Sequence, residues 1–461
     1  MADLLNLNHD VLLIIIWFLP ALDALKFAMT CRLAYELAMP SFLYEFDFSR
    51  FRSKWRGAAN FCEFMLADAP RRMPCLQVLR VTGDPQIIAN PSVDETIDPE
   101  LVSLLVQVVR QSTEMKKITI GRYSDKLLTD HPELLEALAG LRHLYTICVE
   151  DCGFPSLALL SRTASRPRVI ELTRCDLGAS FSDDQHSISQ NILTSATNLK
   201  LHLTSPFAPI QLVTDAVWPS VRALHIVFDT KLGLVPHAFP NLRDFTYSGS
   251  DVYSLYNDDL VEWWALDNVK TYAHVRFACP VRRLVLRYTC ALENGFLSLL
   301  ERTKPTILSF NASLDYAGIC DEARERITHA VQHKLRYLEL FTFWHSTRKG
   351  NVNESAIVPG ILNYVSMFRE VPLVGISILY QDSLSMDGDA ATLLARQVAA
   401  LIPTVTYVGL NLTRFKPLFG DRPVQFEWHF VTSRQEELPQ VNVLSDREGK
   451  EVQARLDDTG H

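Results

Sequence analysis

A short apolar phrase of the form L-x-x-L-x-L recurs along most of this chain, and it constrains the fold more than any other feature of the sequence. Apolar residues alternate with other residues in each phrase, as they do in a strand with one buried face. Most phrases start roughly 20–40 residues apart, a period typical of repeat architectures. The phrases are Leu76–Val81, Lys117–Ile120, Leu144–Val149, Val169–Leu172, Leu199–Leu203, Val221–Ile226, Leu242–Tyr247, Val281–Leu286, Ile307–Phe310, Leu335–Leu340, Leu373–Ile378 and Val405–Leu410.

Helical periodicity fills several of the intervals between these phrases. The predicted helices are Pro132–Leu138, Gly295–Arg302, Asp321–His333, Ala356–Phe368 and Asp389–Leu401. Alternating helix and strand implies right-handed crossovers and a parallel sheet, so we expect an α/β fold. The regular repeat favours a curved solenoid, with strands inside and helices outside, over a doubly wound sheet. A mixed α/β fold without solenoid geometry is the alternative. The pattern resembles that of irregular, degenerate leucine-rich repeats.

The stretch from Leu5 to Phe48 has a different pattern. Apolar residues recur at three- and four-residue spacing after Asp10, which favours a helix that Pro20 ends. We expect a second helix to begin after Asp23 and a third to cross Arg32–Met39 until Pro40 ends it. Three short helices with apolar residues on more than one side cannot bury them all among themselves. Some of this surface must therefore cover a neighbour or a partner.

The spacing of Asp10-Val11-Leu12, Ile15, Phe18-Leu19, Leu22-Asp23 and Thr30-Cys31-Arg32 resembles that of the F-box. Asn8 stands where family members usually carry Pro, and it can still cap the helix. The resemblance, together with the repeats, is to divergent fungal-type F-box proteins with leucine-rich repeats. It implies docking on a Skp-type adaptor and a cullin scaffold by the residues that match the family pattern: Leu7, Val11, Leu12, Ile15, Leu19, Leu25, Ala28 and Cys31. It also implies a substrate-recognition subunit of an SCF-type cullin–RING ubiquitin ligase, active in protein ubiquitination.

Two other interpretations of this stretch stay open. Val11–Leu22 is apolar enough for the core of a signal peptide, although no Lys or Arg precedes it. The helices are alternatively an ordinary buried cap on a larger fold. At the level of function, the alternatives are a leucine-rich-repeat interaction scaffold that forms no ligase, and an enzyme on an α/β scaffold.

Charge and cysteine content narrow the class of protein. The formal net charge of −8 argues against nucleic acid as the main ligand. The nine cysteines form no short-range framework, which suits free thiols in a reducing compartment, so we expect a cytoplasmic or nuclear protein. The N-terminal apolar run is too short to span a bilayer, and no membrane association is expected.

No motif in the sequence predicts catalysis. His329 and His333 lie one helical turn apart, but Ala330 stands where a metalloprotease needs Glu, so a solvated helix face is expected. Cys148 and Cys152 have a tolerable zinc spacing without a second pair nearby. A loop that contains Asp183, Asp184 and His186 reads as a flexible acidic turn. Since no nucleotide-binding loop or serine-hydrolase elbow is present either, we expect no enzyme, cofactor or metal.

If the solenoid prediction holds, binding falls on the inner strand face, where exposed residues alternate with buried ones. The positions that this alternation selects are Arg80, Glu171, His202, His225, Thr246, Arg283, Arg287, Tyr337, Glu339, Phe341 and Tyr407. Arg and aromatic residues are typical interface anchors, so we expect an unidentified protein substrate to bind Arg283, Arg287, Tyr337, Phe341 and Tyr407. For the adjacent pair Trp263-Trp264, we expect one ring to point inward and the other outward.

These patterns divide the chain into an F-box at 1–50, a linker helix at 51–75, a leucine-rich-repeat-like solenoid at 76–412, and a C-terminal β-hairpin cap with a tail at 413–461. The hairpin strands are expected at Pro423–Thr432 and Val441–Leu444, where they would cover the open edge of the sheet. Asp84–Glu100 and Ala179–Gln190 read as surface loops, and the final residues, which read EGKEVQARLDDTGH, are expected to be disordered.

Overall fold

The computed structural model describes residues 7–48, 55–82, 98–121, 124–175, 195–203, 217–227, 235–248, 262–271, 277–287, 294–314, 321–343, 354–380, 388–412 and 425–459. These residues form an α/β protein with sixteen strands that follow one another in sequence order. The chain divides into two compact units. Unit 1 comprises Met1–Thr230 and His237–Asn241, and unit 2 comprises Lys231–Pro236 and Leu242–His461.

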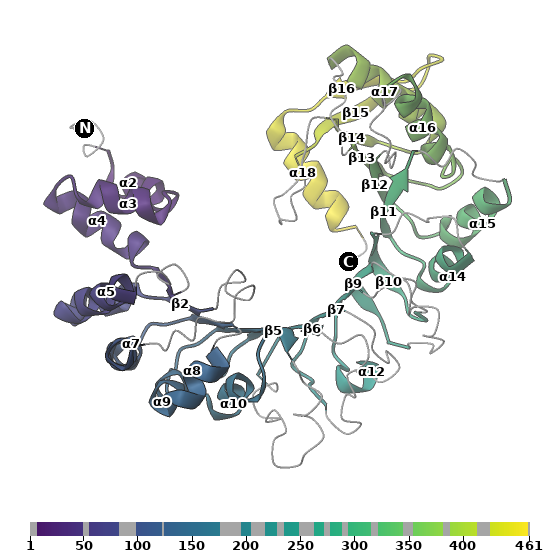
Figure 1. The fold of residues 1–461 in the computed structure, drawn as a ribbon. Coiled ribbons are helices and arrows are strands. Elements are labelled where there is room, and N and C mark those ends of the chain that lie inside the picture. Colours follow the sequence, from purple (N-terminus) through teal and green to yellow (C-terminus); the bar gives the residue numbers. More distant parts are fainter. Residues whose placement is uncertain are drawn as a thin grey trace. The chain divides into compact units, whose positions relative to one another are not determined.

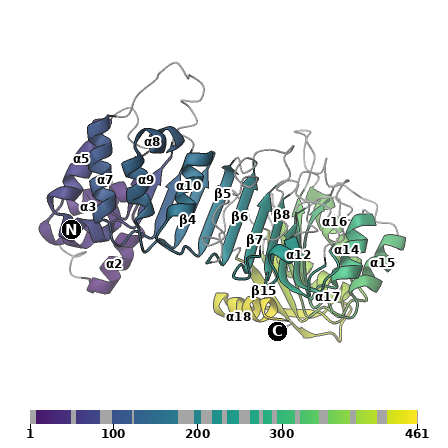
Figure 2. The same cartoon turned by 90° about the horizontal axis from the view of Figure 1, so that it is seen from below.

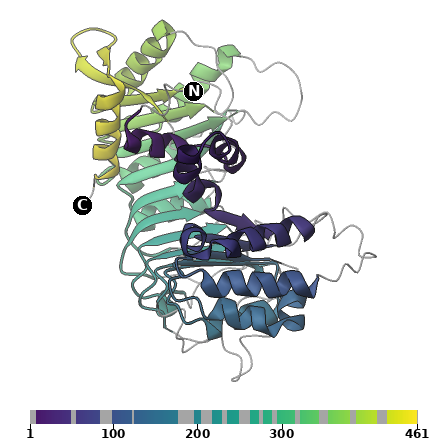
Figure 3. The same cartoon turned by 90° about the vertical axis from the view of Figure 1, so that its left-hand side faces the viewer.

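Unit 1 begins with three helices, α2 (His9–Trp17), α3 (Ala21–Ala28) and α4 (Arg32–Phe42), which Figure 3 shows packed against one another in dark purple. The elements that follow are β1 (Glu45–Asp47), α5 (Trp55–Ala67), α6 (Ala69–Arg72), the 3-10 helix η2 (Met73–Cys75), β2 (Val78–Val81), α7 (Pro99–Gln111), β3 (Lys117–Ile120), α8 (Ser124–Asp130), α9 (Pro132–Ala139), β4 (Thr146–Glu150), α10 (Phe154–Arg162), β5 (Val169–Cys175), β6 (Asn198–Leu203) and β7 (Ala223–Val227). All neighbouring strands from β1 to β7 pair in parallel.

One face of the unit 1 sheet is covered by helices and the other carries polar residues. Figures 1 and 2 show α8, α9 and α10 along the same face of β4 and β5. Ile118, Ile147 and Ile170 point into this core and are almost fully buried. On the opposite face, Glu171 and His225 are half-exposed, whereas Thr119 and Cys148 are buried. The period of two expected from the sequence is therefore seen in β5 and β7 but not in β3 and β4.

Unit 2 contains β8 (Asp244–Ser248), β9 (Leu266–Thr271), β10 (Val281–Leu286), α14 (Asn294–Thr303), β11 (Ile307–Ser313), α15 (Asp321–Val331), β12 (Tyr337–Phe343), α16 (Glu354–Ser366), β13 (Gly375–Tyr380), α17 (Gly388–Leu401), β14 (Tyr407–Asn411), β15 (Glu427–Ser433), β16 (Gln440–Val443) and α18 (Asp446–Asp457). The short helix α12 (Val235–Ala238) spans the boundary between the units. Strands β8 to β14 pair in parallel, whereas β15 and β16 are antiparallel, so the predicted terminal hairpin forms.

The expectation that the final residues are disordered is wrong, because Asp446–Asp457 forms helix α18. Ser445 and Glu448 make a capping box at its start, in which each side chain bonds the other residue's backbone N–H. Val452 and Leu456 lie one turn apart and are buried. The helix is therefore stabilised by a tertiary contact that its mostly polar sequence does not predict. Figure 1 shows α18 on the face of the sheet opposite α14 and α15.

Two helix boundaries also differ from the prediction, and one strand was not predicted. Helix α3 begins at Ala21, with Pro20 as its N-cap, and not after Asp23. Pro40 does not end the third helix, since α4 continues to Phe42 and the N–H of Leu43 still bonds the carbonyl of Met39. Strand β9 had no predicted counterpart. The predicted loop Ala179–Gln190, with Asp183, Asp184 and His186, lies outside the described residues, as does most of Asp84–Glu100.

Candidate functional site

Helices α2–α4 form a small cluster with its own core. The side chain of Asn8 accepts a hydrogen bond of 2.9 Å from the N–H of Asp10, so Asn8 caps α2 as expected. The sulfur of Cys31 accepts a bond of 3.4 Å from the N–H of Ala34 and begins α4. The core consists of Leu12, Ile16, Ala28, Leu37 and Ala38, with Phe27, Tyr35 and Phe42 packed against it.

The outer surface of this cluster is also apolar. Val11, Ile14, Ile15 and Phe18 recur at the spacing of one helix face, and Phe18 is 80% exposed. Other exposed apolar side chains of these helices are Leu7, Leu13, Trp17, Leu22, Leu25, Met29 and Leu33. Most of the exposed large hydrophobic side chains in the described residues thus belong to this one cluster. Such a concentration of exposed apolar side chains marks an interaction site more often than a solvated face. We call it the N-terminal apolar surface.

The residues expected to bind an adaptor fall into two groups. Leu7, Val11, Ile15, Leu25 and Cys31 are exposed, and Leu19 is half-exposed. Leu12 and Ala28 are 3% and 4% exposed and belong to the cluster's core. Ile14, Trp17 and Leu33 contribute to the surface without having been singled out from the sequence. A helix such as α2, apolar around its whole circumference, gives no sequence signal for which side faces outward.

The five residues expected to bind a substrate lie on the face of unit 2 that α18 occupies. Arg283, Tyr337 and Tyr407 fall in one register row across β10, β12 and β14. Arg287 lies over the ring of Phe341, with its guanidinium carbon 4.8 Å from the ring centre. Tyr337 is fully buried, because Trp428, Val452 and Leu456 pack in the same cluster. The sheet and α18 together therefore enclose part of the predicted surface.

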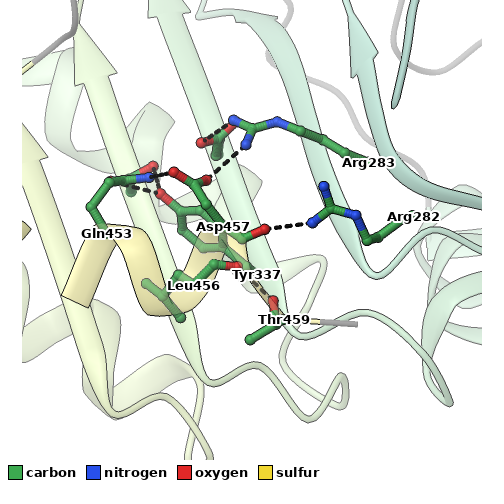
Figure 4. Close-up of polar contacts among 9 residues, drawn as sticks. Arg282, Arg283, Tyr337, Gln453, Leu456, Asp457 and Thr459 are labelled. Atoms are coloured by element: carbon green, nitrogen blue, oxygen red, sulfur yellow. Dashed lines mark hydrogen bonds and ion pairs between the residues drawn. The ribbon is translucent and has the colours of Figure 1, made fainter. Parts of the chain in front are cut away.

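Charged groups surround this contact (Figure 4). One guanidinium nitrogen of Arg283 lies 2.8 and 2.7 Å from the two carboxylate oxygens of Glu339, and the other lies 2.7 Å from Oδ1 of Asp457. Arg282 donates to the backbone carbonyl of Asp457. The hydroxyl of Tyr337 bonds Ser377 at 2.9 Å and Gln453 at 3.4 Å. α18 is thus fastened by polar contacts at its C-terminal end.

Burial governs the ionisation of these groups. It raises the pKa of Glu339, and the opposing attraction of Arg283 does not cancel this effect. Burial alone would lower the pKa of Arg283, but the carboxylates of Glu339 and Asp457 raise it. Burial also raises the pKa of Tyr337. The cluster thus holds an ion pair in which Glu339 is buried and Arg283 is half-buried, and its rupture would leave the Glu339 carboxyl without its partner.

The groups considered for catalysis are dispersed. His329 is exposed on α15 and His333 is exposed beyond its end, as expected for a solvated position. Burial raises the pKa of the Cys148 thiol to about 11 and that of Cys175 to about 11, so both are inert thiols. Within the described ranges, no three His, Cys, Asp or Glu side chains gather as a metal site would require.

Two further placements complete the description of the site. Trp263 is 8% exposed and Trp264 is 91% exposed, which confirms that one ring points inward and the other outward. On the polar face of unit 1, Arg80 pairs with Glu45 and lies in one register row with Glu171 and His225.

The chain matches no protein-family model and no curated protein. None of the described helices combines the length and the apolar character that a membrane span requires.

Proposed function

We propose that this chain is a repeat protein that bridges two binding partners and does no bond chemistry of its own. In this proposal the strand–helix units form an irregular leucine-rich-repeat solenoid, and α2–α4 form a separate docking module. The more specific proposal is a substrate-recognition subunit of an SCF-type cullin–RING ubiquitin ligase. The module would bind a Skp-type adaptor, and the repeats would hold a target protein close to the ubiquitin-charged enzyme, which accelerates transfer by proximity.

The N-terminal apolar surface is the observation that carries this proposal. An N-terminal cap of a repeat protein would turn its apolar side chains toward the first repeat and present polar residues outside. Helix α2 instead leaves Ile14 59%, Trp17 59% and Phe18 80% exposed. This surface includes Leu7, Val11, Ile15 and Leu25, four of the residues that match the F-box pattern, which favours adaptor docking over the scaffold alternative.

Co-purification with a recombinant Skp-type adaptor tests the proposal. The variant Ile15→Glu with Leu25→Glu places two charges on the surface at positions that are 37% and 40% exposed, so the helices should still fold. We expect at least about 100-fold weaker adaptor binding, because each change removes apolar contact and places an unpaired carboxylate in a contact that excludes water.

The matched control is Leu393→Glu with Val443→Glu, which changes two apolar side chains of similar exposure in unit 2. This control should bind the adaptor as the wild type does. A wild-type chain that is folded but does not bind the adaptor would refute the ligase proposal and favour the scaffold. Leu12→Glu is unsuitable for this test, because Leu12 belongs to the core of the cluster and its loss would unfold the helices.

A further inference from the structure

Helix α18 sits on the sheet of unit 2 as a peptide ligand sits on its receptor. Val452 and Leu456, one turn apart, project onto Tyr337 and Trp428, and all four side chains are buried. Figure 4 shows Leu456 and Gln453 over Tyr337, with Asp457 directed toward Arg283. An amphipathic helix that lays its apolar side into a hydrophobic groove is a recurrent mode of peptide recognition.

Two glycines, one on the sheet and one on α18, allow the helix to approach the sheet closely. A Cβ atom at Gly375 would lie 2.6 Å from the Cδ1 atom of Leu456, so the Leu456 side chain occupies space that only glycine leaves open. A Cβ at Gly449 of α18 would lie 2.9 Å from Trp428, so the helix approaches this ring closely. The sheet is therefore fitted to Leu456 and to the small residue seven positions before it.

The groove has the composition of a binding surface. Tyr, Trp and Arg are the residues most enriched at the energetic centres of protein interfaces, and Tyr337, Trp428 and Arg283 stand together beneath α18. Arg283 supplies the polar part of the contact, because it pairs with Asp457 of α18 at 2.7 Å. Glu339 of the sheet pairs with the same guanidinium group and fixes its position.

Helix α18 also differs from the helices that build the sheet. α17 connects β13 to β14 and buries Leu394, Ala395, Val398 and Ala399. α18 follows β16, so no described crossover between strands runs through it, and only Gly449, Val452 and Leu456 of this helix are buried. Its detachment would break no strand pairing and would uncover the face of the sheet beneath it.

We propose that the face of β10–β15 beneath α18 is a helix-binding groove, that α18 is its internal ligand, and that α18 competes with a helix of a partner protein. The partner helix would carry the pattern that α18 presents: a small residue, an aliphatic residue three positions later, a second aliphatic residue after four more, and a carboxylate next to it. The groove is closed while α18 is seated. The inference does not rest on the proposed ligase function, since the groove lies in unit 2 and binds without an adaptor.

A labelled peptide with the sequence of residues 445–459 tests this proposal by fluorescence anisotropy on the full-length chain. In the wild type the tethered α18 outcompetes the peptide, because a tethered segment acts at a high effective concentration. Leu456→Asp releases α18 and leaves the sheet intact, so this variant should bind the peptide at least tenfold more tightly than the wild type does. The same peptide with Leu456→Asp should not bind.

Gly375→Leu is the matched variant on the sheet side. It also expels α18, but its new side chain fills the place of Leu456, so it should not bind the peptide. In both variants, hydrogen exchange should be faster at the amides of 446–457 and unchanged in β11–β14. If Leu456→Asp fails to fold, Gln453→Ala with Asp457→Ala weakens the same contact through half-exposed side chains and should tighten peptide binding in the same direction.

Three results would overturn the proposal. Release of α18 by Leu456→Asp without a gain in peptide binding would show that this face is no helix receptor. Loss of protection in β11–β14 together with α18 would make α18 an integral part of the core. A wild-type dimer that the peptide splits into monomers would assign the groove to a second copy of the chain and not to a different partner.

Discussion

Helix α2, near the start of the chain, and helix α18, near its end, place their apolar residues in opposite ways. α2 is apolar almost throughout, yet only Leu12 and Ile16 are buried, and its remaining apolar side chains face outward. α18 is mostly polar, and its two large apolar side chains, Val452 and Leu456, are both buried. Both helices bury two large apolar side chains, so burial within the chain does not explain why α2 carries so many more.

The surplus apolar surface of α2 has a physical cost in water, because about 25 cal/mol is lost for each Å² of apolar area that stays exposed. A partner that covers this surface recovers that free energy. α18 has no such surplus, since its own sheet already covers its apolar side. This difference supports the proposal that an external partner covers α2, whereas α18 packs on the chain's own sheet.

The largest difference in stability should come from two arginines: Arg283 of β10, which pairs with α18, and Arg32 of α4. Arg283→Ala leaves Glu339 buried without its cation, and we expect a loss of about 3–5 kcal/mol in the stability of unit 2. Arg32 makes an exposed pair with Glu36 on α4, so Arg32→Ala should cost about 0.5 kcal/mol or less. Hydrogen exchange at β12 and α4 measures both values, and equal losses would contradict the comparison.

Truncation of one apolar residue at each end gives the next largest contrast. Leu456→Ala opens a cavity over Gly375 and should lower the stability of α18 by about 2–5 kcal/mol, measured at its own amides. Phe18→Ala removes a side chain that is 80% exposed, so α2 should lose less than about 0.5 kcal/mol. Adaptor affinity should show the reverse order, with Phe18→Ala weakening binding and Leu456→Ala leaving it unchanged.

The N-terminal caps should behave alike at both ends. Asn8→Ala removes the bond to the N–H of Asp10, and Ser445→Ala removes the bond to the N–H of Glu448. Each change should cost about 1 kcal/mol in local helix stability. Amide exchange in α2 and α18 checks this expectation. A loss at Asn8 far above that at Ser445 would show that the cap of α2 has a role beyond starting the helix.

The smallest effect concerns pH. The side chain and backbone N–H of Ser445 both bond the carboxylate of Glu448 and lower its pKa from the ordinary 4.5. The folded state thus binds this proton less readily than the unfolded state, so the contribution is present above pH 4.5 and is lost as pH falls through the lowered pKa. The difference in α18 stability between wild type and Glu448→Gln should shrink on acidification. A difference that grows would contradict the capping box.

The sequence was sufficient to predict most of the sheet. Each L-x-x-L-x-L phrase overlaps a strand, because a period of two with one buried face leaves a clear pattern. Strand β9, with the sequence LDNVKT, escaped because only Leu266 and Val269 of its residues are apolar. Helix α18 was not predicted for a related reason. Two aliphatic residues at i and i+4 are too weak a helix signal alone, and tertiary packing on the sheet stabilises this helix.

The site was predictable only in part. The residues of α2–α4 were predicted to form a docking module, with Leu12 among its contact residues. Leu12 and Phe18 have the same apolar character, and packing alone decides that Leu12 is buried and Phe18 exposed. Arg283 and Tyr337 lie on one face of the sheet, as the alternation predicts, but Tyr337 was expected to be exposed and is fully buried. Their contact with Asp457 and Gln453 joins residues more than 100 positions apart, which no local pattern reveals.

The most direct test of the account is hydrogen exchange of the full-length chain with and without a Skp-type adaptor. We predict slower exchange at the amides of α2–α4 when the adaptor is bound, and unchanged exchange in α18 and in the strands of unit 2. Unchanged exchange in α2–α4 at saturating adaptor would show that the N-terminal apolar surface does not bind it, and would contradict the central claim.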